Sequence, residues 1–135
     1  MIPKELKPIA DSVIEAKLPN GLKIRLLPSS AVPTICYYTF FHVGSRNERP
    51  GITGISHLFE HMMFNGAKKY GPGEFDKTLE SNGGSSNAYT SNDMTVYYED
   101  FMAEALERVV DLESDRMRSD SRSMTRSSAS AMKSS

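Results

Sequence analysis

The sequence predicts an α+β domain in which helices cover a mainly antiparallel sheet. Its strand-like and helix-like segments come in blocks: three strands, two helices, two strands and a last helix. Such blocks differ from the strict strand–helix alternation that is typical of parallel sheets. An Asn-Gly pair also joins the first two strand-like runs, and this pair is the strongest short signal for an antiparallel hairpin.

The three N-terminal strands differ in character. The first two are expected at residues 13–18 and 22–27, with the turn at Asn20 and Gly21, because both turn residues accept positive φ. Residues 34–43 are aromatic or β-branched on both alternating faces. This pattern indicates a central strand of a sheet that is covered on both sides.

Apolar residues at helical spacing predict three helices, at residues 54–64, 74–81 and 102–118. A second pair of strands is expected between the last two helices, at residues 85–90 and 94–100. The apolar positions of the last helix that should face the sheet are Leu106, Val109, Val110 and Leu112.

Size and composition fit one soluble domain of 135 residues, with 39% hydrophobic and 24% charged residues. The net charge of -1 gives no sign of the excess positive charge that nucleic-acid binding needs, and no apolar run is long enough to span a membrane. Residues 1–8 lack the apolar stretch of a signal peptide, so the compartment stays open, including export after loss of a leader. Cys36 excludes an intrachain disulfide because it is the only cysteine, and its apolar run predicts a buried thiol.

The pentapeptide HLFEH at residues 57–61 carries the chemistry of the chain. Residues four apart lie on the same face of a helix, so His57 and His61 can point two imidazole nitrogens at one ion. Zinc takes neutral imidazole readily, and a catalytic zinc keeps an open position for water. Glu60 lies where its carboxylate can take a proton from that water, which makes it the expected general base.

Other interpretations of these residues were weighed. Two histidines can fall four apart by coincidence, but two of only three in the chain flank a glutamate here. The third, His42, is expected to be a satisfied imidazole at a strand end, although a structural metal site closed by it stays open. The carboxylates that could complete a metal site by chemistry alone are Glu99, Glu104, Asp111, Glu113 and Asp115. Glu113 and Asp115 are expected to be solvated charges on a helix face.

Further motifs surround the pentapeptide in a fixed order. They are LPNGL (18–22), VGS (43–45), GISHLFEHMMF (54–64), SNGG (81–84), NAYT (87–90), TVYY (95–98) and DRM (115–117). From Leu18 to about Arg118 the chain thereby resembles the N-terminal part of the M16 family, which includes insulinase, pitrilysin and the mitochondrial processing peptidase. The similarity looks closest to its bacterial, two-domain members.

The resemblance implies an incomplete M16-type domain of the LuxS/metallopeptidase-like fold. It implies a zinc endopeptidase that hydrolyses peptides or unfolded proteins, with His57 and His61 as zinc ligands and Glu60 as general base. The residues implied in substrate binding, by pairing with an extended peptide, are Asn87, Ala88, Tyr89 and Thr90. An ordinary edge strand is an equally good interpretation of these four residues.

The chain departs from the family pattern at its C-terminal end. Catalytic zinc normally has three protein ligands, and the family's third is a glutamate that would fall just beyond Ser135. Residues 119–135 are instead rich in Ser and poor in apolar side chains, which predicts a disordered tail. Residues 13–118 are therefore expected to form a partial domain after an N-terminal segment, residues 1–12.

Two functions follow for such a chain. The first is zinc-dependent peptide hydrolysis by the family, in a truncated or frame-shifted chain that lacks the third ligand and the second homologous domain and is inactive alone. The second is a non-catalytic domain that binds a peptide or a partner subunit. The intact pentapeptide favours descent from active peptidases.

Overall fold

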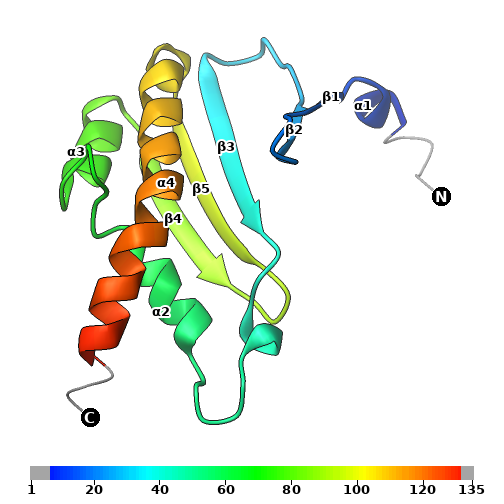
Figure 1. The fold of residues 1–135 in the computed structure, drawn as a ribbon. Helices are drawn as coiled ribbons and strands as arrows, with labels where there is room; N and C mark the ends of the chain where they lie inside the picture. Colours follow the sequence, from blue (N-terminus) through cyan, green and yellow to red (C-terminus); the bar gives the residue numbers. More distant parts are fainter. Residues whose placement is uncertain (1–6, 132–135) are drawn as a thin grey trace. The chain divides into compact units, whose positions relative to one another are not determined.

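The computed structural model describes residues 7–131 and divides into two compact units, Met1–Pro33 and Thr34–Ser135. The first unit contains a short helix and a hairpin. The second contains a three-stranded sheet and the remaining helices, including the helix that carries residues 57–61 (Figure 1).

The hairpin of the first unit follows α1 (Lys7–Asp11) and pairs β1 (Ile14–Lys17) with β2 (Lys23–Leu26) in antiparallel register. The predicted turn is confirmed, but its geometry differs from a two-residue turn. Gly21 has φ +91°, and every residue with positive φ in the described chain is a glycine. The amide of Gly21 donates to the carbonyl of Leu18 at 2.9 Å, as in a type I turn followed by a glycine bulge.

The sheet of the second unit has the strand order β3-β5-β4 and is antiparallel throughout. Its strands are β3 (Thr34–Phe41), β4 (Ser85–Thr90) and β5 (Thr95–Met102). The predicted α+β class with an antiparallel sheet is confirmed. The predicted central position of β3 is wrong among the described strands, because β5 lies in the middle. The face of β3 that holds Tyr38 and Phe40 is exposed, and so is Cys36, which was expected to be buried.

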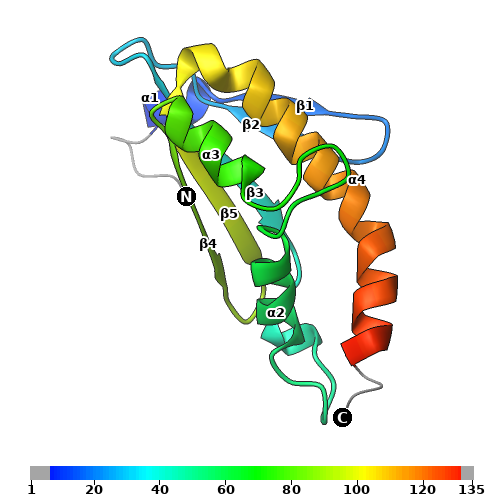
Figure 2. The same ribbon diagram turned by 90° about the vertical axis from the view of Figure 1, so that its left-hand side faces the viewer.

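Three helices accompany this sheet: α2 (Ile55–Met62), α3 (Glu74–Ser81) and α4 (Leu106–Ala131). Short 3-10 turns, η2 (Ser45–Asn47) and η3 (Ala103–Ala105), precede α2 and α4. Figures 1 and 2 show α3 and α4 over one face of the sheet and α2 near the sheet end where β4 stops. None of the helices in the described residues is both long and apolar enough to cross a membrane.

The last helix does not end at Arg118. Its backbone continues to Ala131, so the prediction of a tail without secondary structure is wrong for residues 119–131. Residues 132–135 lie outside the described residues. Low apolar content argues against burial, but it does not stop a helix. The sequence contains neither glycine nor proline after Gly84, and these are the residues that end helices most effectively.

The hydrophobic core lies between the sheet and the two covering helices. Its buried members are Phe75, Leu79, Phe101, Ala105, Val109 and Leu112. The predicted inward positions Val109 and Leu112 are confirmed, whereas Leu106 and Val110 are 39% and 44% exposed. The buried face of α4 instead continues from Val109 and Leu112 to Glu113 and Arg116, in the i, i+3/i+4 progression of one helix face.

A buried charged triad, Glu99, Glu113 and Arg116, adjoins this core. Each of its members is at most 3% exposed, so the expected solvation of Glu113 is wrong. Arg116 Nη2 lies 2.5 Å from Glu113 Oε1 and 3.3 Å from Glu99 Oε1. Its guanidinium also lies 4.5 Å from the ring centroid of Tyr97 and 4.8 Å from that of Phe75. One arginine therefore forms ion pairs with two buried carboxylates while its guanidinium packs against aromatic rings.

The triad makes the stability of the fold depend on pH. Burial raises the pKa of Glu99 to about 8, and the negative charge of Glu113 adds to this rise while Arg116 opposes it. Since the folded state holds this proton more tightly than the unfolded state, the free energy of unfolding should fall as the pH rises from about 5 to about 8. The expected total is a few kcal/mol, measured by urea unfolding across that range.

Glu99→Gln should flatten this pH dependence, because the amide does not titrate. Glu107→Gln is the matched control, since Glu107 is exposed on α4 and should leave the slope unchanged. An unaltered slope in Glu99→Gln would show that another group causes the pH dependence.

Candidate metal centre

The helix that carries the motif begins at a clamped N-terminus. Gly54 occupies the cap position in the left-handed region with φ 85°, and α2 follows from Ile55. The carboxylate of Glu48 accepts hydrogen bonds from the amides of Gly54 at 2.8 Å and Ser56 at 2.9 Å. These two amides hold the pKa of Glu48 below its usual value. Glu48 thus satisfies two of the free amides at the start of the helix, where a negative charge is also favoured.

The two histidines converge on one side of α2. The Nε2 atoms of His57 and His61 lie 3.0 Å apart, and their rings are nearly perpendicular at 88°. Two nitrogens bound to one tetrahedral zinc at about 2.05 Å would be separated by about 3.3 Å. The side chains therefore already have the spacing that a shared zinc ion requires.

Glu60 lies beside the histidines but is buried, with 7% of its surface exposed. Its Oε2 accepts a hydrogen bond from the hydroxyl of Thr90, the last residue of β4. The same oxygen lies 3.5 Å from Nδ1 of His57. The carboxylate is therefore fixed between the helix and the sheet, next to the exposed imidazoles.

A third ligand is absent from the part of the chain that the structure describes. No group of three His, Cys, Asp or Glu side chains there could hold a metal ion. His42 consequently does not close a structural site with the motif. The other carboxylates have different partners: Glu99 and Glu113 contact Arg116, Asp111 contacts Lys69 and Tyr70, and Asp115 accepts from the amides of Lys69 and Tyr70.

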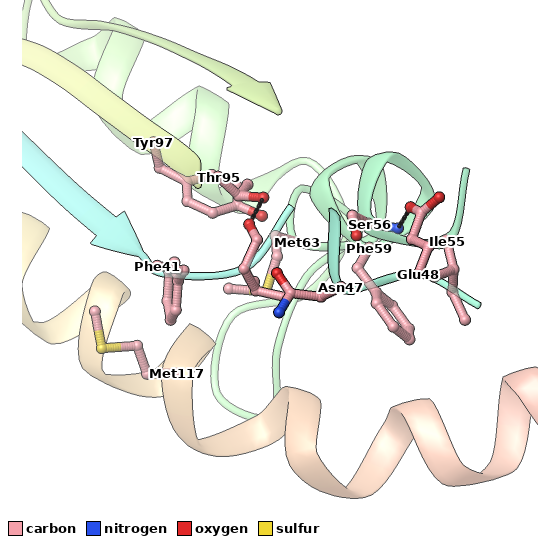
Figure 3. A pocket seen from close by; sticks show the side chains of 11 residues that line it. Phe41, Asn47, Glu48, Ile55, Ser56, Phe59, Met63, Thr95, Tyr97 and Met117 are labelled. Carbon is pink, nitrogen blue, oxygen red and sulfur yellow. Dashed lines mark hydrogen bonds between the residues drawn. The ribbon is translucent and has the colours of Figure 1, made fainter. Parts of the chain in front are cut away.

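A cavity of about 300 Å³ lies behind the motif, against the face of α2 that Ser56 and Phe59 form (Figure 3). Its walls come from β3, η2, α2, β5 and α4 and are mostly apolar. The lining residues are Phe41, Val43, Asn47, Glu48, Ile55, Ser56, Phe59, Met63, Thr95, Tyr97 and Met117. Neither histidine nor Glu60 lines it, so it is separate from the candidate metal centre.

The four predicted substrate residues lie on β4, which pairs only with β5 among the described strands. Asn87 and Tyr89 are exposed, whereas Ala88 and Thr90 are partly buried on the opposite face. The amide of Ala88 donates to the side chain of Asn87 at 2.8 Å. The edge of this strand is therefore open to pairing, but Thr90 faces the motif rather than solvent.

Sequence reasoning identified the pentapeptide but missed the contacts that support it. The cap by Glu48 joins residues six and eight positions apart, and the contact between Thr90 and Glu60 joins residues thirty apart. A carboxylate shortly before a glycine-initiated helix could have suggested the cap. Nothing in the sequence marks the cavity or the partner of Glu60.

Comparison with known proteins identifies the family of the chain. A sequence model of the family described as "Insulinase (Peptidase family M16)" matches residues 30–134. This match starts after the expected Leu18 and continues past Arg118, where the resemblance was expected to stop. The Ser-rich end of the chain is therefore included in it.

Individual relatives agree with the family match. Human insulin-degrading enzyme is 40% identical over 96 residues, which cover 70% of this chain and 9% of the enzyme. The zinc protease PqqE of Helicobacter pylori is 43% identical over 82 residues, covering 60% of this chain and 18% of that protein.

Solved structures show the same relationship at the level of the fold. A protease from Helicobacter pylori superposes with a TM-score of 0.77 at 36% identity, covering 79% of this chain and 26% of that one. Pitrilysin superposes with a TM-score of 0.74 at 28% identity, covering 79% of this chain and 12% of its own.

The chain thus spans between 9% and 26% of the length of these relatives. The matched part contains the pentapeptide, the sheet beside it and the covering helices. On this sequence and structural similarity, the chain belongs to the insulinase family of peptidases, family M16.

Proposed function

We propose that this chain carries the zinc-binding and proton-transfer residues of an endopeptidase. The observation that supports this most directly is the 3.0 Å approach of the Nε2 atoms of His57 and His61 beside the buried carboxylate of Glu60. Two imidazole lone pairs repel each other at this distance unless a proton or a cation lies between them. Relatives of the chain are named zinc proteases, which agrees with zinc as the cation.

The residues present fit a zinc ion as two of its ligands. His57 and His61 would hold it through Nε2, while Nδ1 of His57 faces the carboxylate of Glu60 at 3.5 Å. Bound zinc supplies Lewis acidity, which polarises a peptide carbonyl and makes a nearby water more acidic. Glu60 would accept the proton of that water and deliver it to the departing amine.

The substrate would be an extended peptide or an unfolded protein segment. The open edge of β4 can add such a segment as a further strand, with residues 87–90 supplying the pairing groups. Main-chain pairing of this kind gives affinity with little sequence preference. It also brings the peptide to the strand that ends beside Glu60.

Two imidazoles alone should bind zinc weakly, because the remaining positions are left to exchangeable water and no carboxylate ligand neutralises the ion. A third protein ligand would come from outside the described residues. In the proposed enzyme a second homologous domain or subunit completes the substrate chamber. Residues 1–135 by themselves are expected to show negligible hydrolysis. The competing function is peptide or subunit binding without catalysis, and the intact motif argues against it.

Zinc titration of the metal-free chain tests the proposal. Wild type should bind zinc weakly but measurably by calorimetry. His57→Ala and His61→Ala should each weaken binding by about tenfold or more. His42→Ala is the matched control and should leave the affinity unchanged.

Absence of zinc binding by wild type, or equal losses in all three variants, would contradict the assignment of the ligands. Robust peptide hydrolysis by residues 1–135 would instead show that the chain completes the metal site by itself.

A further inference from the structure

Thr90 occupies a distinctive place at the end of the sheet. It is the last residue of β4 and lies opposite Thr95, the first residue of β5. Its side chain is partly buried and contacts α2, whereas its neighbour Tyr89 is 48% exposed on the other face. Strand alternation therefore turns the Thr90 hydroxyl towards the motif.

The hydrogen bonds at this point can be assigned proton by proton. A threonine hydroxyl has one proton to donate. Thr95 donates its proton to the carbonyl of Val43 at 3.0 Å, so this hydroxyl can only accept from other groups. Thr90 lies 3.4 Å from Thr95 but also contacts Oε2 of Glu60. A carboxylate is the stronger acceptor, so the Thr90 proton goes to Glu60.

The two oxygens of Glu60 are consequently unequal. Oε2 accepts from Thr90 and lies 3.5 Å from Nδ1 of His57. Oε1 takes part in no hydrogen bond with any residue that the structure describes. It also does not belong to the fully enclosed polar atoms without a partner, which lie in the charged triad. One oxygen is thus anchored, and the other is left for water.

We propose that Thr90 is a positioning residue that fixes the carboxylate of Glu60, so that Oε1 faces the open position beside the histidines. This inference rests on the proposed function, in which Glu60 is the proton acceptor. The hydrogen bonds of the Thr90 hydroxyl go to Glu60 and Thr95 rather than to the imidazoles, so Thr90 acts through Glu60. This adds a role to the two expected for Thr90, which were substrate pairing and membership of an ordinary edge strand.

The position of Thr90 on the strand gives this contact a further consequence. The edge of the same strand can pair with an added peptide. Thr90 therefore couples the position of the bound peptide to the position of the Glu60 carboxylate. An offset of about 1 Å between a reacting group and its catalyst can cost about a hundredfold in rate. A hydroxyl between strand and base limits such an offset.

The test uses isotope-labelled, metal-free chain in solution. Three-bond carbon and nitrogen couplings report the χ1 and χ2 rotamers of Glu60. Wild type and Thr90→Ser should show one rotamer, because both keep the hydroxyl. Thr90→Val keeps the size of the side chain but loses the hydroxyl, and should show rotamer averaging at Glu60. Thr95→Val makes the same change one strand away and should leave Glu60 in one rotamer.

Zinc affinity supplies the second measurement. It should stay within about threefold of wild type in Thr90→Val, since the imidazoles keep their places. A single Glu60 rotamer in Thr90→Val would overturn the proposal, and so would averaging in Thr90→Ser or in Thr95→Val. A larger loss of zinc affinity in Thr90→Val would also overturn it, because Thr90 would then support the ligands rather than the base.

If Thr90→Val does not fold, wild type decides the question. A slowly exchanging Thr90 hydroxyl proton with a cross-peak to Glu60 supports the proposal, and rapid exchange with water overturns it. None of these measurements requires turnover. Failure of the peptidase function would therefore leave the rotamer result interpretable.

Discussion

Replacing Arg116 by methionine should destabilise the fold by about 3–5 kcal/mol. The substitution removes the guanidinium that contacts both Glu99 and Glu113, while both carboxylates stay at 1% exposure. Glu99 can relieve part of the cost by binding a proton, since its pKa is about 8. The charge of Glu113 then stays in the core without the guanidinium, next to the hydroxyl of Thr39 at 3.4 Å, and Tyr97 loses its contact with the guanidinium.

Urea unfolding at pH 7 measures this loss. A variant without a cooperative transition has lost the whole free energy of unfolding of the wild type. Arg108→Met is the matched control, because Arg108 is exposed on the same helix and its replacement should change stability by no more than about 0.5 kcal/mol. Adding Glu113→Gln to Arg116→Met should recover at least about 1 kcal/mol, since it removes the unpaired charge. A loss below about 1 kcal/mol in Arg116→Met would contradict the structural role of the triad.

The sequence was most informative about local structure. Helical spacing located α3 at the predicted residues, and the Asn-Gly pair located the hairpin. These signals depend on neighbours a few residues apart, so the sequence contains them completely. The end of α4 was mispredicted because low apolar content was taken to exclude a helix. Composition predicts burial, whereas a helix ends where residues such as glycine or proline disfavour its backbone.

Long-range features could not be predicted in this way. Glu113 looks like a surface charge on a helix face, and only the fold places it against Arg116 and opposite Glu99 on β5. The edge position of β3 likewise depends on strand order, which an apolar pattern on both faces does not determine.

The candidate metal centre likewise has a local part that the sequence predicts and a long-range part that it does not. His57, Glu60 and His61 lie within one and a half turns of a helix, so their spacing alone predicts that they come together. The anchor of Glu60 on Thr90 comes from another element, and its discovery required coordinates. The structure supplies the geometry around the motif, and the roles of its residues stay predictions.

The last prediction concerns catalysis by the motif. A chimera that follows residues 1–118 with the matching remainder of the Helicobacter pylori protease should bind zinc more tightly and cleave unstructured peptides. The 36% identity and TM-score of 0.77 make this relative a suitable donor of the parts that follow the matched region in its own chain. In the chimera, Glu60→Gln should lower kcat by about 10² to 10⁴-fold, because the amide cannot accept a proton from water.

Glu60→Gln is a sharp test because it keeps almost everything else. Its amide oxygen can still accept the hydroxyl proton of Thr90, and the Nε2 atoms of His57 and His61 are untouched. Zinc affinity should therefore stay within about threefold of the parent chimera, whereas His57→Ala should lose both zinc and turnover. Glu104→Gln, at an exposed position, should change neither. Loss of zinc in Glu60→Gln would make this carboxylate a ligand, and retention of more than about a tenth of kcat would place the base elsewhere.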